Sequence, residues 1–207
     1  SVGTKLDFIP DAGTTIYGRV SSEEGAVKNV VVSDGVEVTV TDENGIYQLK
    51  SKKKWKYVFI SIPGGYEVPS KGVLPLFYQM LQGDPGTTER KDFTLKKVSG
   101  QDTYKVFMLG DMHLANRTDD TRQFLQFTSD LNGYRAAHFG EKMYAITLGD
   151  MTWDLYWYSN SYALPEYLNT INSHVKDLQI FHTIGNHDYD YKTASDLAAE
   201  GKRSEER

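Results

Sequence analysis

Residues 106–113 read Val-Phe-Met-Leu-Gly-Asp-Met-His, and this stretch decides how the second half of the chain is interpreted. The apolar run has the length and character of a buried parallel strand, and a glycine, Asp111 and His113 follow it. Open α/β sheets carry their chemistry beyond the carboxyl ends of their strands. We therefore expect a carboxylate and an imidazole to project from one strand end, and this pair suits a divalent transition metal.

The same pattern occurs twice more along the chain. Residues 144–150 are an apolar run that ends in Gly149 and Asp150, and residues 180–188 end in Gly-Asn-His-Asp. Helix-length segments separate the three runs, so a βαβαβ arrangement would bring the three strand ends to one edge of a parallel sheet. Taken singly, each glycine and aspartate could instead only cap a turn or a helix.

Composition and charge narrow the classes of protein. The chain has 207 residues, is 39% hydrophobic and 13% aromatic, and lacks cysteine, which excludes disulfides and thiolate metal sites. No apolar run is long enough to cross a membrane. Residues 99–207 carry ten basic against sixteen acidic residues, which argues against a nucleic-acid-binding surface. The chain begins with Ser1 rather than Met, so we expect that a leader or tag has been removed.

The first half of the chain has the pattern of an all-β domain. Short apolar runs alternate with turn residues every eight to twelve positions, which predicts a small antiparallel sandwich over residues 1–98. Residues 36–41 alternate valine with polar residues and predict a half-buried strand. The joint falls at residues 99–102, and the α/β domain occupies 99–207.

Residues 50–56 form a basic cluster, Lys-Ser-Lys-Lys-Lys-Trp-Lys. Such a cluster could face nucleic acid or an anionic surface. A solvated hairpin loop is the simpler interpretation, because the rest of this half carries eight basic against twelve acidic residues.

The strand and turn sequences of residues 1–98 resemble the transthyretin-like or carboxypeptidase-regulatory-like sandwiches common in extracytoplasmic bacterial proteins. They include Gly-Arg-Val at 18–20 and Thr-Asp-Glu-Asn-Gly-Ile-Tyr-Gln-Leu at 41–49. The resemblance implies a fold and no activity. Together with the processed start, it leads us to expect a periplasmic or cell-surface location in a bacterium.

The motifs Asp-x-His, Gly-Asp and Gly-Asn-His-Asp, in this order, resemble those of the calcineurin-like metallophosphoesterases. The resemblance implies a four-layer αββα domain with two divalent metal ions (Mn, Fe, Zn or Mg) between its sheets. Asp111 and His113 would bind the first metal, Asp150 would bridge both, and Asn186 would bind the second. His187 would lie beside the phosphate ester as the catalytic histidine, with Asp188 orienting it.

The sequence departs from the family pattern in three ways. No histidine follows Asp188, so the later His and Gly-His-x-His elements have no counterpart. The acidic residue after the Gly-Asp motif, Asp154, stands one position late. A complete family domain is also much longer than the segment after Gly100. His182, inside the third apolar run, is expected to be a core or supporting residue rather than a ligand.

We therefore expect a fragment: a sandwich domain followed by the N-terminal part of a phosphoesterase domain, which lacks its C-terminal half as a partner. The expected function is metal-dependent hydrolysis of a phosphomonoester or phosphodiester by metal-activated water, weak or absent in this piece alone. The alternative is an extracytoplasmic glycan- or protein-binding protein with a non-catalytic phosphoesterase-like scaffold. Aromatic residues 153 and 156–158 could form a wall of the substrate site or an interface.

Overall fold

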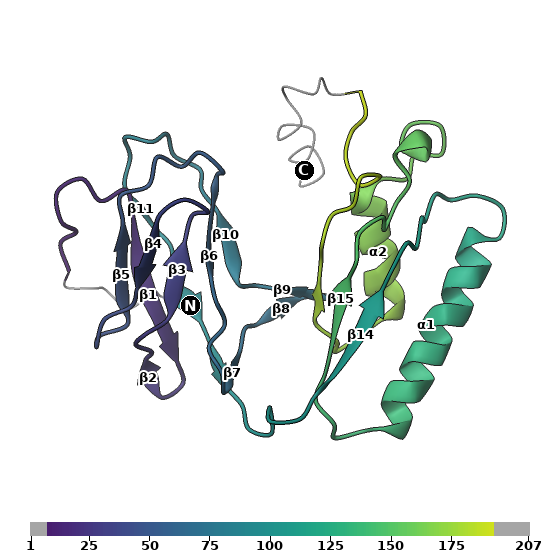
Figure 1. The fold of residues 1–207 in the computed structure, drawn as a ribbon, viewed down its shortest axis with the longest axis horizontal. Coiled ribbons are helices and arrows are strands. Elements are labelled where there is room, and N and C mark those ends of the chain that lie inside the picture. Colours follow the sequence, from purple (N-terminus) through teal and green to yellow (C-terminus); the bar gives the residue numbers. More distant parts are fainter. Residues whose placement is uncertain (1–7, 193–207) are drawn as a thin grey trace. The chain divides into compact units, whose positions relative to one another are not determined.

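A computed structural model describes residues 8–192 and divides the chain into two compact units. The N-terminal unit comprises Ser1–Pro69 and Leu76–Gln101, and the C-terminal unit comprises Ser70–Pro75 and Asp102–Arg207. The described chain is mostly β, with two α-helices, α1 (Asp120–Ala137) and α2 (Leu164–His174) (Figure 1). Neither helix combines the length and the apolar composition needed to span a bilayer.

The N-terminal unit contains two main sheets. In one, β1 is the central strand and pairs with β2, β5, β11 and β12; the other has the order β10-β6-β3-β4, and β13 pairs separately with β7. The bounds are β1 (Ile16–Ser22), β2 (Gly25–Ala26), β3 (Val31–Ser33), β4 (Val38–Val40), β5 (Ile46–Leu49), β6 (Tyr57–Ile60), β7 (Tyr66–Glu67), β10 (Tyr78–Met80), β11 (Glu89–Arg90), β12 (Phe93–Thr94) and β13 (Lys96–Lys97). Val20, Val32, Tyr47 and Val58 are among the residues of the core between these strands.

The prediction of a purely antiparallel sandwich is wrong for β1. This strand runs parallel to both β11 and β12, with Ile16 opposite Glu89 and Val20 opposite Phe93. Parallel neighbours need a long connection, and the chain between β1 and β11 provides it. The short apolar runs predicted the strands but carried no information on their direction.

Residues 36–41 contain the predicted strand, and the valines of this segment lie on its exposed side. Val38 is 64% and Val40 48% exposed. Thr39 instead faces the fully buried Val32 across the ladder. The Thr41 hydroxyl fixes this register from inside, because it donates to the Val27 carbonyl (2.8 Å) and accepts from the Val30 N–H (2.9 Å). Since side chains alternate between faces, this register turns the valines outward.

The C-terminal unit is built on a parallel three-stranded sheet in the order β14-β15-β16. Its strands are β14 (Lys105–Leu109), β15 (Met143–Thr147) and β16 (Ile180–Phe181). This confirms the predicted order of parallel strands joined by helices. Both helices lie on the same face of the sheet (Figure 1), as expected when successive crossovers in the order β14-β15-β16 have the same hand. The four-layer arrangement that the resemblance implies remains a prediction.

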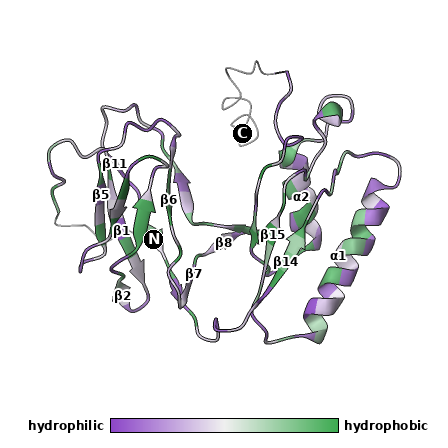
Figure 2. Cartoon of the chain, viewed as in Figure 1, coloured by the Kyte–Doolittle hydropathy of each residue, from purple (hydrophilic) through white to green (hydrophobic). Residues whose placement is uncertain are grey.

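The two helices cover their face of the sheet with the residues expected from helical spacing. Phe124 and Leu131 of α1, and Tyr167 and Ile171 of α2, are buried in one cluster with the sheet. Figure 2 shows hydrophobic and hydrophilic residues alternating along α1. The helix α2 begins with a carboxylate cap, because Glu166 accepts a hydrogen bond from the Ala163 N–H (2.9 Å).

A hairpin from the first half of the chain completes this unit. It consists of β8 (Ser70–Lys71) and β9 (Leu74–Pro75). Val73 is fully buried in the core of the C-terminal unit, and its carbonyl accepts a hydrogen bond from the Ile180 N–H (2.8 Å). The Val73 N–H donates to the Asn172 side chain (2.8 Å). The hairpin therefore acts as one more edge segment beside β16.

Candidate metal centre

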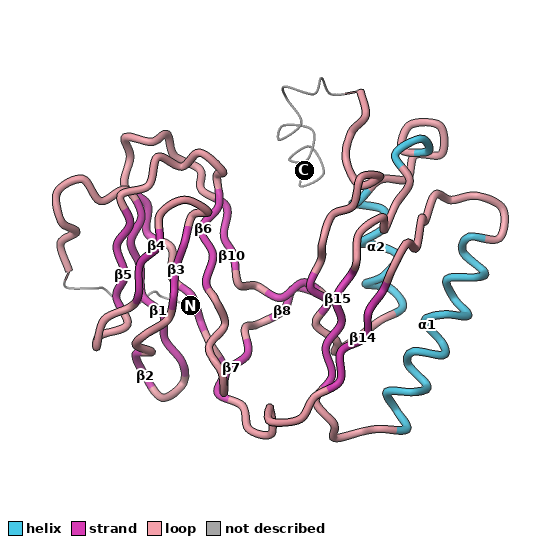
Figure 3. The backbone as a smooth tube through the Cα atoms, viewed as in Figure 1, coloured by secondary structure: helices cyan, strands magenta, loops and turns pink. Residues whose placement is uncertain are grey.

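The ends of β14 and β15 lead into loops that run side by side (Figure 3). The His113 N–H donates to the Asp150 carbonyl and the Leu114 N–H to the Met151 carbonyl, both at 2.9 Å. A bridge between Leu114 and Thr152 continues this parallel pairing beyond the regular strands. The loops therefore hold the first two motifs in a fixed register.

This register brings together three of the predicted metal ligands. One ligand atom from each of Asp111, His113 and Asp150 lies within 4.8 Å of the other two. The His113 Nε2 atom is 3.8 Å from Asp111 Oδ1 and 3.9 Å from Asp150 Oδ2. The Asp111 side chain is 78% exposed and that of Asp150 only 14%, so the group opens to solvent on one side.

The backbone of these residues is unusual. Asp111, His113 and Asp150 all have positive φ angles, of 45°, 45° and 52°. Non-glycine residues rarely adopt this conformation, and it occurs preferentially at functional sites because the surrounding structure must enforce it. Here three such residues belong to one group of potential ligands.

The third motif packs directly against the second. A Cβ atom at Gly149, whose φ is +96°, would lie 2.8 Å from the Gly185 Cα, so the two loops need glycine to approach this closely. The His187 N–H donates to Asp150 Oδ1 (2.9 Å). Asn186 lies between these two contacts and is exposed, and its amide makes no hydrogen bond within residues 8–192. Asn186 is therefore next to His187 in sequence, and no hydrogen bond among the described residues fixes the orientation of its side chain.

The side chain beside the His187 ring is Asp154, in the 3₁₀ helix Asp154–Tyr156. The distance from His187 Nδ1 to Asp154 Oδ1 is 2.8 Å. Because a carboxylate only accepts hydrogen bonds, Nδ1 carries the proton and Nε2 faces away from this contact. The sequence assigned this orienting role to Asp188 and noted Asp154 only as an acid displaced by one position. The structure corrects that assignment.

Asp188 has a different role, because its carboxylate is fully buried beneath the loops. It accepts hydrogen bonds from the Thr152 N–H (2.8 Å), the Thr152 hydroxyl (2.9 Å) and the Gly185 N–H (3.0 Å). The Met151 N–H donates to the same carboxylate at 3.2 Å. Asp188 therefore ties the second and third loops together, and its carboxylate has no hydrogen bond to the His187 ring among the described residues.

Trp153, one of the aromatic residues that the sequence analysis named, adjoins the group, and so does an arginine that it missed. The Trp153 ring centroid lies 5.1 Å from that of His113 and 5.9 Å from that of His187. The Arg117 guanidinium lies 5.2 Å from the Trp153 ring and donates to the His113 carbonyl (2.9 Å). Only the position of Trp153, soon after Asp150, was a signal in the sequence. The contact of Arg117 depends on the course of the loop after β14.

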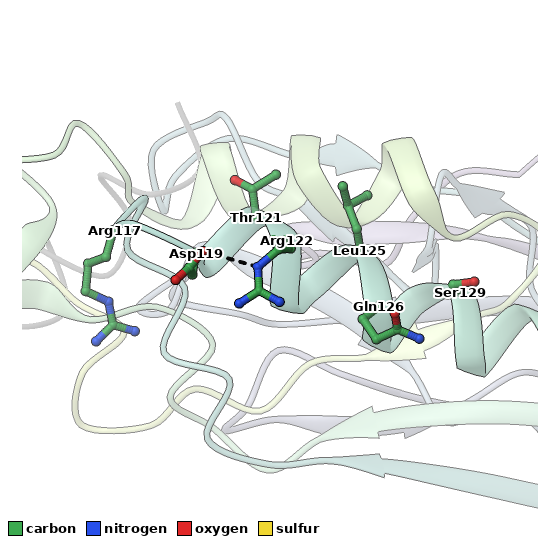
Figure 4. Close-up of a pocket in the computed structure, with 7 residues that line it drawn as sticks. All are labelled: Arg117, Asp119, Thr121, Arg122, Leu125, Gln126 and Ser129. Carbon is green, nitrogen blue, oxygen red and sulfur yellow. Dashed lines mark hydrogen bonds and ion pairs between the residues drawn. The ribbon is translucent and has the colours of Figure 1, made fainter.

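Arg117 also lines a cavity of about 590 Å³ at the start of α1 (Figure 4). The other lining residues are Asp119, Thr121, Arg122, Leu125, Gln126 and Ser129. Arg122 pairs with Asp119 at 3.1 Å, as the dashed line in Figure 4 marks. The three grouped ligands are not among the lining residues, so this cavity is separate from the metal centre.

The donor set fits a divalent cation. Two carboxylates and one imidazole are ligands that Mn, Fe, Zn and Mg accept in various combinations. Carboxylates this close to one another also repel, and a cation between them would relieve that repulsion. The described residues therefore supply the chemistry for metal binding, while the number and identity of the ions stay predictions.

His182 does not belong to the ligand group. Burial lowers its pKa to about 4, and its Nε2 atom lies 3.0 Å from the Tyr167 hydroxyl. This confirms the interpretation of His182 as a core residue.

Comparison with known families finds a similarity in the first half of the chain. Residues 14–98 match the model described as the N terminal of calcineurin-like phosphoesterase. No curated protein matches the sequence. The matched range covers much of the N-terminal unit, and Asp111, His113 and Asp150 lie beyond it. Residues 14–98 are thus similar to the region that belongs to the N-terminal part of calcineurin-like phosphoesterases.

Proposed function

We propose that this chain contributes part of the active site of a metal-dependent phosphoesterase. The observation that carries the proposal is the convergence of Asp111, His113 and Asp150, with ligand atoms within 4.8 Å, beside the hydrogen-bonded pair His187–Asp154. The match of residues 14–98 to a phosphoesterase-associated region supports the same interpretation independently. The alternative of a non-catalytic binding scaffold gains no observation of its own.

Each residue has a role that follows from its chemistry. Asp111, His113 and Asp150 would hold the metal, and Asn186, on the adjoining third loop, would add an amide oxygen. When bound, divalent cations would activate water and neutralise charge on the phosphate. Asp150 is suited to a central position, because one of its oxygens already orients the third loop through the His187 N–H.

The His187–Asp154 pair would handle a proton. With Nδ1 donating to Asp154, the neutral ring presents Nε2 as an acceptor, and the protonated ring presents it as a donor. A protonated His187 would stabilise negative charge on a phosphate oxygen or protonate the leaving oxygen of the ester. Asp154 would keep the ring in the required orientation through the contact with Nδ1.

Metal content tests the proposal without depending on turnover. The chain would be dialysed against trace Mn²⁺ or Zn²⁺ and its metal measured by elemental mass spectrometry, alongside hydrolysis of bis-p-nitrophenyl phosphate. We expect metal in the wild-type chain and its loss in Asp150→Ala and in His113→Ala. Asp119→Ala is the matched control, because it removes an exposed acid outside the group. Equal metal content in wild type and Asp150→Ala would contradict the proposal.

A further inference from the structure

The lysine-rich loop of the N-terminal unit, residues 50–56, is held in a defined conformation. Ser51 and Lys53 are buried, while Lys50, Lys52 and Lys54 are exposed. The Ser51 hydroxyl donates to the buried carboxylate of Asp34. The side chains of Ser51 and Lys53 thus attach the loop to the domain, and the lysines between and beside them extend into solvent.

Lys53 is the stronger anchor. Its ammonium forms a 2.7 Å ion pair with Glu89 and donates to the Thr87 carbonyl (2.8 Å). The side chain is only 2% exposed, so this one lysine of the cluster is used structurally. The cluster is therefore more ordered than the solvated loop that the sequence favoured.

Apolar side chains are exposed next to these lysines. Trp55 is 48% exposed, and a Cβ atom at Gly35 would lie 3.1 Å from its ring, so the ring rests on the turn between β3 and β4. Val36, on that same turn, is 61% exposed. The exposed face of Val38 and Val40 continues from it along β4. We call these valines, Trp55 and the exposed lysines 50, 52, 54 and 56 the Lys-Trp surface.

The positive charge of this surface is unpaired within the described part of the chain. None of the exposed lysines 50, 52, 54 and 56 has an ion pair there, and the Lys54 ammonium lies 4.8 Å from the Trp55 ring centroid. The exposed acid on the neighbouring turn is Glu37. A chain with a net charge of −5 thus presents a local patch of the opposite sign.

We propose that the Lys-Trp surface binds the surface of an anionic phospholipid bilayer. Lysines are attracted to anionic headgroups, and tryptophan prefers the boundary between headgroups and acyl chains. The exposed valines favour a bilayer over nucleic acid, because phosphate backbones offer nothing for aliphatic side chains to enter. The inference does not depend on the metal centre, which lies in the other unit.

Vesicle sedimentation tests this proposal. The full chain would be mixed with phosphatidylcholine vesicles with and without phosphatidylglycerol, at low and high salt. We expect binding only with phosphatidylglycerol, and weaker binding at high salt. The triple variant Lys52→Gln/Lys54→Gln/Lys56→Gln should weaken the partition coefficient by about a hundredfold, at about fivefold per lysine. Glu37→Gln should strengthen it.

Two controls make the result specific. Lys28→Gln/Lys96→Gln removes exposed lysines elsewhere and should change binding far less. In the wild type, vesicles should shift the tryptophan emission to shorter wavelength, and Trp55→Phe should abolish that shift while Trp153 and Trp157 remain. The proposal is overturned if wild type shows no binding, if the triple variant binds as tightly, or if emission is unchanged. Tighter binding to a DNA duplex under the same salt would overturn it in favour of nucleic acid.

Discussion

The contact between His187 and Asp154 decides how the candidate site would handle a proton. We expect Asp154→Asn to leave metal content unchanged and to lower hydrolysis by up to about a hundredfold, because the imidazole loses its orientation and its charge partner. Metal analysis and the pH profile of hydrolysis check this, and Asp190→Asn serves as the control. Loss of metal to the extent seen in Asp150→Ala would instead make Asp154 a ligand.

The core histidine His182 predicts how stability depends on pH. Its pKa is lowered to about 4, below an ordinary value of about 6.5, so the unfolded chain binds the proton more readily. The corresponding stability is fully present above pH 6.5 and is lost as the pH falls toward 4, by about 3 kcal/mol in total. Urea unfolding at several pH values measures this. His182→Gln removes the titration and should flatten the slope over that interval; an unchanged slope would contradict the assignment.

At this scale the sequence predicted that Asp111, His113 and Asp150 would come together, but it did not predict all of their contacts. Asp111, His113 and Asp150 follow apolar runs, and parallel strands necessarily bring such residues to one edge. The pairing of His187 with Asp154 depends on the turn taken after Asp150, and residue spacing alone does not determine that turn. For the same reason the sequence did not predict the contacts of Asp188, whose carboxylate accepts hydrogen bonds from Thr152 and Gly185.

The strand β4 shows how a register is set by polar side chains. We expect Thr41→Val to lower the free energy of unfolding of the N-terminal unit by about 1–3 kcal/mol, because the buried Val30 N–H and Val27 carbonyl each lose a partner. Urea denaturation checks this. Thr39→Val is the matched control, since the Thr39 hydroxyl has no hydrogen bond among the described residues. Equal losses in both variants would argue against the hydroxyl as the determinant.

The exposed valines of β4 also mark a limit of pattern reasoning. Alternation of valine and polar residues predicts a strand with two unlike faces, and that strand exists. It does not say which face is buried. The Thr41 hydroxyl decides this, and its hydrogen bonds connect positions 11 and 14 residues apart.

Each of the two units is built from two separate segments of the chain, and no local sequence pattern predicts this. Composition and periodicity changed near residue 100, and the structure divides the chain at Gln101 and Asp102. The segment Ser70–Pro75 nevertheless belongs to the C-terminal unit. The sequence of this segment does not differ in character from the residues around it. The hydrogen-bond partners of Val73 are Asn172 and Ile180, which lie far away in the chain.

A glycine substitution tests whether this segment matters to the C-terminal unit. Gly72 has φ +60°, and a Cβ atom there would lie 2.2 Å from Asn172 Oδ1, the acceptor for the Val73 N–H. We expect Gly72→Ala to destabilise the C-terminal unit by about 1–3 kcal/mol. Gly64→Ala is the control, because its Cβ would meet nothing within 4 Å. Hydrogen exchange at Ile180 reports the difference, and equal protection in both variants would contradict this prediction.

The same hairpin has a consequence for the order of events during synthesis. Val73 leaves the ribosome well before Asn172, which lies 99 residues later in the chain. At translation rates of about 5–20 residues per second, roughly 5–20 s separate the two. The N-terminal unit can gather its strands within that interval, whereas the apolar Val73 segment has no partner yet. During this interval the nascent chain would therefore expose the apolar hairpin to solvent, and chaperones could bind it there.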